Sequence, residues 1–425
     1  MGALHFPSQV AAERYLLQQR ISNLELNPSA PSSESNSTLE ALQLQLVALN
    51  APIYKLSDDL LAEVFLAGME EYPWGDEFDF AAMDKYQATL CSTVARFRRV
   101  AINTPRLWTI PTFRFVHGWA GFVGYQRDRC RDSNLPLCLF VELEAPVPDL
   151  LGGAILRDLW KRAKRAKIRD YHDWDQDPGL SGLSVVPTAS SLTELSLVSF
   201  CFPSIVHLQN LLAATPGLRK LVMRSISLWS DDAINHTTTL PFLSTLELPI
   251  QIWHVLKYFD VSTCTDFRLN GSHDCQWWGC NWREDGWDDL SPEIPAAHLR
   301  SVRTLTLADW CTTQPMLVKT LCAFPSLVHL TVDGVQLWLG SENAVGECPP
   351  LEDVIITRAE RVSILLPFIL QSTTSDGTDD STLRRVELDD YGDISDELLD
   401  MLQERVPVVV QNGVQLSNSQ VASVR

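Results

Sequence analysis

The side chains that most often carry enzyme chemistry do not converge on a motif in this sequence. The chain has nine histidines and ten cysteines, but no two histidines stand at the spacing of a metal-ligand pair. It contains no phosphate-binding P-loop, no GxSxG nucleophile elbow, no HExxH zinc motif and no GxGxxG after a strand pattern. We therefore expect a protein that is not an enzyme and that holds no cofactor or metal.

Two short segments come nearest to a metal site. The acidic run DGTDD (376–380) lacks the closing carboxylate of a calcium-binding loop, and it is typical of a solvated loop. Cys275 and Cys280 have only His273 and acidic residues beside them, whereas a structural zinc ion needs four suitable ligands. The two cysteines are therefore interpreted as unpaired thiols in a loop.

One segment is rich in tryptophan, a residue common in binding hot spots because it joins a large apolar area to a hydrogen-bond donor. Within eleven residues of the chain lie Trp277, Trp278, Trp282 and Trp287. Two interpretations stay open: the loop folds back and buries these rings, or it contacts a protein substrate.

The segment RDLWKRAKRAKIR (157–169) is strongly basic. It could be a nuclear-import signal, a patch for an acidic partner, or the solvated face of a helix, which we favour.

Composition limits the partners. The 425-residue chain has a formal net charge of −19, which disfavours binding to nucleic acid or to an anionic membrane. No apolar run approaches the ~18 residues of a membrane span, and the first residues lack a secretory signal. Most cysteines lie in apolar strings, as buried thiols do in a reducing compartment. We expect an intracellular protein, cytoplasmic or nuclear.

The first 54 residues predict two helices around a polar loop. The first helix covers roughly 9–26, and the loop 27–37 is rich in serine and proline. The second helix repeats apolar residues at three- and four-residue steps, the spacing of a coiled-coil seam. This seam is Leu39, Leu42, Leu46, Leu49 and Ile53. The pair is either a hairpin packed on its own chain or a dimerising coiled coil.

Residues 55–110 predict a small helical domain. Its first helix follows the N-cap Ser57 and carries an apolar stripe, and a second helix spans the segment from Leu90 to just before Thr104-Pro105. The stripe of the first helix is Leu60, Leu61, Val64 and Phe65, and the apolar face of the second is Leu90, Val94, Phe97 and Ala101.

This domain resembles the F-box, in the F-box-like form common in mushroom-type fungi. The family reads approximately LPxELLxEIF and then LxxVCxxWRxIAxxTPxLW. The first half is matched by Leu56, Asp59, Leu60, Leu61, Glu63, Val64 and Phe65. The second half is matched by Leu90, Phe97, Arg98, Val100, Ala101, Thr104, Pro105, Leu107 and Trp108. Ser57 replaces the usual proline, Phe97 replaces the usual tryptophan, and residues 70–86 are longer than usual.

The resemblance implies docking to a Skp-type adaptor and, through it, to a cullin-based ubiquitin ligase. The adaptor-binding residues that it implies are Leu56, Leu60, Leu61, Val64, Phe65 and Phe97.

After a connector at 111–134, the string L-x-x-L-x-L recurs about every 25 residues, inside the range of leucine-rich repeats. The copies begin at Leu192, Leu218, Leu243, Val302, Leu327, Leu351 and Leu383, with a weaker copy at Cys264. Several copies follow a helix pattern and a proline. The fold class is therefore α/β: the helical F-box-like module, then a curved leucine-rich-repeat solenoid with a parallel sheet over 135–425, with an insertion near 270–298. Strings around 135–143 and 166–172 are interpreted as two earlier, degenerate strands.

These features favour a substrate-recognition subunit of a Skp–cullin–F-box type ubiquitin ligase, with an unknown protein substrate held by the repeats. The alternative is a leucine-rich-repeat scaffold that no longer binds the adaptor and acts outside ubiquitylation. The expected substrate-facing positions of the repeats are Glu194, Lys220, Glu247, Arg268, His329, Asp353 and Arg385.

Overall fold

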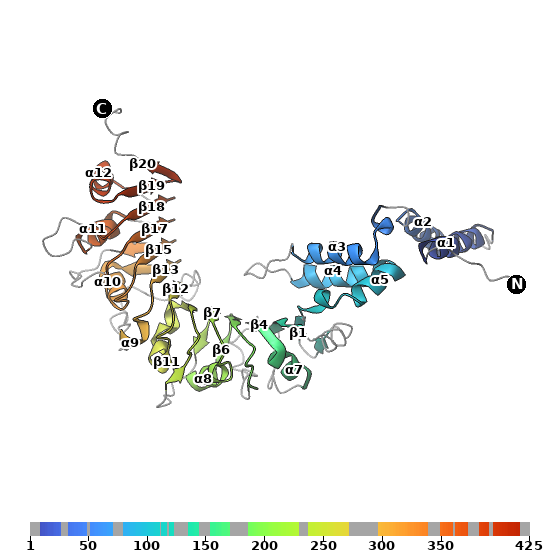
Figure 1. The fold of residues 1–425 in the computed structure, drawn as a ribbon, viewed down its shortest axis with the longest axis horizontal. Coiled ribbons are helices and arrows are strands. Elements are labelled where there is room, and N and C mark those ends of the chain that lie inside the picture. The colour runs from blue at the N-terminus through green and yellow to red at the C-terminus, as the bar shows by residue number, and fades with distance from the viewer. Residues whose placement is uncertain are drawn as a thin grey trace. The chain divides into compact units, whose positions relative to one another are not determined.

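In the computed structural model the chain divides into two compact units, and each is described by itself (Figure 1). Unit 1 contains residues 1–110 and 128–135, and unit 2 contains residues 111–127 and 136–425. The structure describes residues 9–26, 33–48, 52–70, 80–110, 112–116, 119–122, 135–143, 154–170, 186–228, 237–271, 296–338, 349–359, 362–372, 382–390 and 394–416.

Unit 1 begins with a helical hairpin. Helix α1 (Gln9–Leu26) has the bounds that the sequence predicts, and it packs against α2 (Ser33–Ala48) of the same chain. Of the two interpretations, packing on the same chain is therefore observed for this pair.

The rest of unit 1 is a small helical core. It consists of η1 (Pro52–Lys55), α3 (Asp58–Glu70), α4 (Phe80–Thr93), α5 (Ala95–Ile102) and η2 (Pro105–Trp108). Its centre is aromatic: the ring of Phe97 stacks on Tyr54 at 5.0 Å and meets Phe65 edge-on at 5.2 Å. Trp108 donates its indole N–H to the carbonyl of Ala101 at 2.9 Å, so η2 is fixed against α5.

The single helix predicted from Leu90 to before Thr104 is wrong in one respect, because the chain breaks between α4 and α5. Val94 is extended there, with φ −142° and ψ 157°. Just before it, the hydroxyls of Ser92 and Thr93 both donate to the carbonyl of Thr89, at 3.2 and 2.5 Å. Such side-chain bonds compete with the helical backbone pattern, and a β-branched valine then favours extended backbone. Val94 is consequently only half-buried.

Unit 2 is a mixed α/β unit built on a 14-stranded sheet whose strands follow one another almost in chain order. Every pair is parallel except the two outermost pairs, which are antiparallel. From one edge to the other the strands are β2 (Trp119–Phe122), β1 (Thr112–Val116), β3 (Leu137–Leu143), β4 (Ala163–Asp170), β5 (Glu194–Val198), β7 (Lys220–Arg224), β10 (Thr245–Pro249), β12 (Asp266–Asn270), β13 (Thr304–Ala308), β15 (His329–Asp333), β17 (Asp353–Thr357), β18 (Arg385–Asp389), β19 (Val408–Gln411) and β20 (Val414–Leu416).

Described helices lie in seven of the connections between successive strands of the sheet, and from β13 onward they form a layer beside it (Figure 1). They are α7 (Ala154–Arg162), α8 (Ile205–Ala213), η3 (Ile250–Tyr258), α9 (Ala296–Leu299), α10 (Gln314–Cys322), α11 (Val362–Ser372) and α12 (Asp396–Arg405). A mostly parallel α/β arrangement is thus confirmed.

The repeated leucine pattern supplies the core of unit 2. In the copy from Leu192 the apolar residues at the first, fourth and sixth positions are all buried, and the same holds for every other copy, including the weaker one at Cys264. The fourth positions pair in register across the sheet: Leu221 with Leu246, and Leu305 with Leu330. Alternate residues of a strand face opposite sides, so one face of the sheet is sealed and the other keeps the polar residues.

Seven of the described strands end in a turn through the left-handed backbone region. The residue directly after the strand has positive φ at Ser199, Ser225, Asp309, Gly334, Arg358, Asp390 and Asn412. The amide of Asp309 then donates to the last carbonyl of the next strand, that of Asp333, at 2.8 Å. Gly271 fills the corresponding position after β12, and a Cβ there would lie 1.9 Å from the carbonyl oxygen of Asp309. This close approach requires glycine.

Two expectations for the start of the repeats need correction. Part of the predicted connector at 111–134 forms β1 and β2, which extend the sheet. The basic segment 157–169 is not one solvated helix face, because the chain changes from α7 to β4 at Ala163. The predicted early strands are confirmed as β3 and β4.

Candidate functional site

Helix α3 buries one side in unit 1 and carries two large apolar side chains on its exposed side. Leu60 is 55% exposed and Val64, one turn later, is 44% exposed. Their neighbours Asp59, Glu63 and Ala67 are exposed as well. We call Leu60 and Val64 the docking face, since apolar side chains held in water by a rigid helix favour a protein contact.

The structure separates the six residues that the F-box resemblance implied for adaptor binding. Leu61, Phe65 and Phe97 are buried and form the core under α3, and Leu56 is half-buried. Of the six, therefore, only the two residues of the docking face present an exposed apolar surface. The neighbouring elements therefore bury only part of the apolar stripe that the sequence shows on α3.

Arg96 holds the start of α3 in place, a role that sequence reasoning missed. This residue is 8% exposed, and its guanidinium donates to the carbonyl of Tyr54 at 2.7 Å, to the carbonyl of Leu56 and to the Asp58 carboxylate at 2.9 Å. One planar side chain thus ties η1, the turn before α3 and the first residue of α3 to α5. The sequence did contain a signal for this role, because Arg96 is a charged residue on the inner face of α5, where the other residues are apolar.

Asp58 and Ser57 complete this junction. The Asp58 carboxylate also pairs with Arg99 at 2.7 Å, and its pKa is lowered, mainly by the hydrogen bond from Arg96 and against the effect of desolvation. Ser57, at the position where the F-box pattern has proline, accepts a hydrogen bond from the amide of Leu60 at 3.3 Å. The serine therefore caps the helix that carries the docking face.

The second candidate surface is the polar face of the parallel sheet in unit 2. The seven positions expected to face a substrate all occur at outward positions of strands in the parallel part of the sheet. Six of them are exposed or half-buried, whereas Glu247 is buried. Its carboxylate accepts hydrogen bonds from Arg224 and Asn270 of the two flanking strands. Arg268 in turn donates to the Asn270 side chain at 2.8 Å.

These four side chains form a polar network across the sheet face between β7 and β12. It joins three neighbouring strands through side chains, and it satisfies the buried carboxylate of Glu247. Further along the face His329 pairs with Asp353 at 2.7 Å. These side chains therefore pair with one another across the polar face of the sheet.

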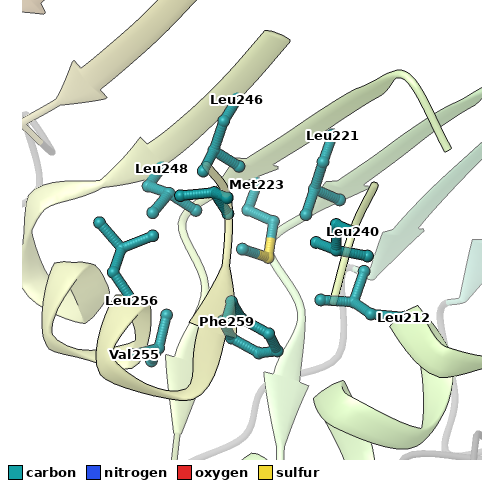
Figure 2. A pocket seen from close by; sticks show the side chains of 10 residues that line it. Leu212, Leu221, Met223, Leu240, Leu246, Leu248, Val255, Leu256 and Phe259 are labelled. Carbon is teal, nitrogen blue, oxygen red and sulfur yellow. The ribbon is translucent and has the colours of Figure 1, made fainter. Parts of the chain in front are cut away.

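A cavity in unit 2 does not add a ligand site. Figure 2 shows it between β7, β10, α8 and η3, where only hydrocarbon and thioether groups point inward, among them Leu221, Met223 and Phe259. Its volume is about 10 Å³, roughly the space of one water molecule, and it offers no polar partner. It is a packing defect of the core.

The described residues offer no cluster of metal ligands. No group of three or more histidine, cysteine or acidic side chains that could hold a metal ion occurs among them. Burial raises the pKa of Cys264 to about 12 and raises that of Cys138, which keeps both thiols protonated. Trp277, Trp278, Trp282 and Trp287 lie outside the described residues, as do Cys275 and Cys280.

In the part of the chain that the structure describes, no helix is both long and apolar enough to cross a bilayer.

The comparisons with known proteins do not assign the chain to a family. No family model and no curated protein sequence matches it. Solved structures do match, among them the crystal structure of a protein from Bacteroides fragilis that is 14% identical, with a TM-score of 0.33. That match covers 68% of this chain and 69% of the other. A TM-score this low carries no argument about fold or function, so both rest on the residues themselves.

Proposed function

We propose that the chain is a non-catalytic substrate-recognition subunit of a Skp–cullin–F-box type ubiquitin ligase. In this proposal the helical part of unit 1 is an F-box-like module that binds a Skp-type adaptor. Unit 2 is a leucine-rich-repeat solenoid that binds a protein substrate on the polar face of its sheet.

The observation that carries the proposal is the docking face of α3. Leu60 and Val64 are exposed, although the same helix buries Leu61 and Phe65 completely in its own core. Exposed apolar residues are common singly, but two at one-turn spacing on a helix anchored by Arg96 make a preformed contact surface. These two positions also match the F-box pattern.

The mechanism needs no catalytic group on this chain. An adaptor bound to unit 1 would bring the ubiquitin-conjugating machinery close, and a substrate bound to unit 2 would be presented to it at high effective concentration. The repeats suit this task because each strand position is fixed by its neighbours, so binding costs little conformational entropy. The tryptophan-rich insertion remains a predicted additional substrate contact.

The test is co-purification with a purified Skp-type adaptor. Replacing Leu60 and Val64 together by aspartate should weaken binding about 100-fold or more, since burying each side chain contributes roughly 1.5 kcal/mol or more and the charges add a desolvation penalty. Both residues are exposed, so the variant should fold.

Phe242 of unit 2 provides the matched control. It is 59% exposed, and its replacement by aspartate adds the same kind of charge at an exposed apolar position outside unit 1. Adaptor binding should be unchanged in that variant. Equal loss in both variants, or no wild-type binding at micromolar concentration, would contradict the proposal.

A second candidate function is a leucine-rich-repeat scaffold that acts without the adaptor. It is favoured by the burial of Leu61, Phe65 and Phe97, which leaves a smaller docking face than the six-residue set implies. A wild-type chain that binds no adaptor but still captures a protein through unit 2 would support it.

A further inference from the structure

The charges on the polar face of the sheet in unit 2 are sorted by strand. Alternate residues of each strand face this side, and the pairing register carries the same positions from one strand to the next. The charged residues at these outward positions can therefore be counted strand by strand from β4 to β18.

The strands β4, β5 and β7 form a basic patch. The charged residues at their outward positions are Arg165, Lys167, Arg169, Glu194, Lys220 and Arg224. The adjoining strand β3 adds one buried carboxylate, that of Glu142, so five cations against two carboxylates leave a net charge of +3. Two further cations, Lys164 beside Arg165 and Arg219 directly before β7, are exposed at the same end of these strands.

The strands β15, β17 and β18 form an acidic patch on the same face. The charged residues at their outward positions are Asp333, Asp353, Arg385, Glu387 and Asp389, and His329 lies among them. Four carboxylates against one cation leave a net charge of −3 with the histidine neutral. At the ends of these strands Glu352 pairs with Arg384, and the charges of Arg358 and Asp390 cancel.

Between the two patches the face is nearly neutral and carries hydroxyl groups. The charged residues at the outward positions of β10, β12 and β13 are Glu247, Asp266 and Arg268, with a net charge of −1. The half-buried hydroxyls in and beside this stretch are those of Thr245, Thr304, Thr306 and Thr331, and none of them forms a hydrogen bond with a described residue. A hydroxyl both donates and accepts, so this stretch suits the backbone of an extended chain.

Each patch keeps a charge that no described side chain neutralises. Arg165 pairs with Glu194 at 3.0 Å, and Arg224 pairs with Glu247. Lys220 in the basic patch and Asp389 in the acidic patch are exposed, and neither forms an ion pair with a described residue. Opposite charges at the two ends of one face attract a partner of complementary charge order and repel the reverse order.

The order of the strands sets the spacing that a partner must match. From β5 to β17 there are six steps between neighbouring strands, which is about 29 Å along the sheet at roughly 4.8 Å per step. An extended chain advances roughly 3.3 Å per residue, so it covers this distance in about nine residues.

We propose that the polar face binds an extended segment of a partner protein that is acidic at one end and basic at the other. The acidic end lies over the basic patch, the basic end lies over the acidic patch, and the neutral stretch between them crosses β10 to β13. This inference names the class of substrate, and it rests on the proposed function in taking unit 2 as the part that binds the substrate.

The test is fluorescence anisotropy of a labelled peptide with the full chain at low ionic strength, where surface charges are least screened. The block peptide has four glutamates, a spacer of five serine and glycine residues, and four lysines, with blocked termini, so that the centres of its charged ends are about nine residues apart. A comparison peptide of the same composition alternates glutamate and lysine. The block peptide should bind about tenfold or more tightly than the alternating one, because only its ends match the two patches.

Two charge reversals on the face should each weaken binding of the block peptide about tenfold, since each replaces an attraction by a repulsion. They are Lys220→Glu and Asp389→Lys, at exposed positions where the fold should be retained. The matched controls are Lys319→Glu on α10 and Glu404→Lys on α12, which make the same changes in charge on exposed side chains of the helix layer (Figure 1). Both controls should bind the block peptide as the wild type does.

Three results would each overturn the proposal: no binding of the block peptide at millimolar concentration, equal affinity for the two peptides, or equal losses in the test and control variants. Self-association of the wild type at low ionic strength that Lys220→Glu abolishes would also overturn it, because a second copy would then cover the face. The peptide assay contains no adaptor and the co-purification contains no peptide. A failure of this inference is therefore distinguishable from a failure of adaptor binding.

Discussion

Replacing Arg96 by alanine tests whether its side chain holds α3, the helix that carries the docking face, in place. In Arg96→Ala two backbone carbonyls, those of Tyr54 and Leu56, lose a charged donor in a buried position. Hydrogen bonds to charged groups contribute about 1.5–3 kcal/mol each, so the two together predict a loss near 3 kcal/mol or more. The Asp58 contact adds little, since its carboxylate is 46% exposed and screened by water.

Arg99→Ala is the matched control. Arg99 pairs with the same Asp58 carboxylate, but its side chain is 45% exposed, and we expect a loss of about 0.5 kcal/mol or less. Both variants remove one positive charge from α5, so the difference between them isolates the buried carbonyl contacts.

The assay is hydrogen exchange of the full chain, read by mass spectrometry on peptides of α3. A loss of about 3 kcal/mol in the local opening free energy predicts exchange roughly 100-fold faster in Arg96→Ala than in the wild type. Similar protection of α3 in the two variants would refute the role assigned to Arg96. Arg96→Lys should also lose protection, because an ammonium group cannot reproduce the planar fork that serves three acceptors.

Two further predictions concern the turns and the pH. Gly271→Ala should lower the free energy of unfolding of unit 2 by about 3 kcal/mol or more, because the new Cβ meets a backbone carbonyl, whereas Gly413→Ala has open space and should cost only about 1 kcal/mol for its positive φ of 75°. Urea unfolding measures both, and equal losses would contradict the close approach at Gly271. Asp58 has a lowered pKa, so its contribution to unit 1 is present above the unfolded value near 4 and is lost as the pH falls through the folded value. In the wild type, the midpoint for unfolding of α3 should therefore fall as the pH is lowered into the acid range. Asp58→Asn should reduce this fall, and an unchanged dependence on pH would contradict the role assigned to the Asp58 carboxylate.

The repeats of unit 2 could be predicted from the sequence in detail. An apolar residue, most often leucine, at the first, fourth and sixth positions of each copy defines a strand with one apolar face, and a unit of that kind can bury this face only by stacking on similar units. Even the weak copy from Cys264 to Leu269 forms a strand in register with its neighbours. The pattern determined these strands because the same local signal recurs and each copy supports the next.

The start of the sheet and the docking face could not be predicted in the same way. The basic run through Lys161 and Arg165 suits a helix by local propensity, but the strands beside β4 impose extended backbone from Ala163 onward. Likewise the stripe of α3 shows which residues are apolar, not which of them the neighbouring helices cover.

What the sequence by itself determined is therefore the repeat period, the buried positions of the repeats, the extent of α1 and the apolar stripe of α3. The tertiary structure decided which of the apolar side chains become buried and which stay exposed. Leu61 and Phe65 are buried and become core, with Phe65 against Phe97 of α5, while Leu60 and Val64, on the same stripe, remain exposed. Burial depends on the width and position of the packing neighbour, and that information belongs to the contact between elements rather than to either element alone.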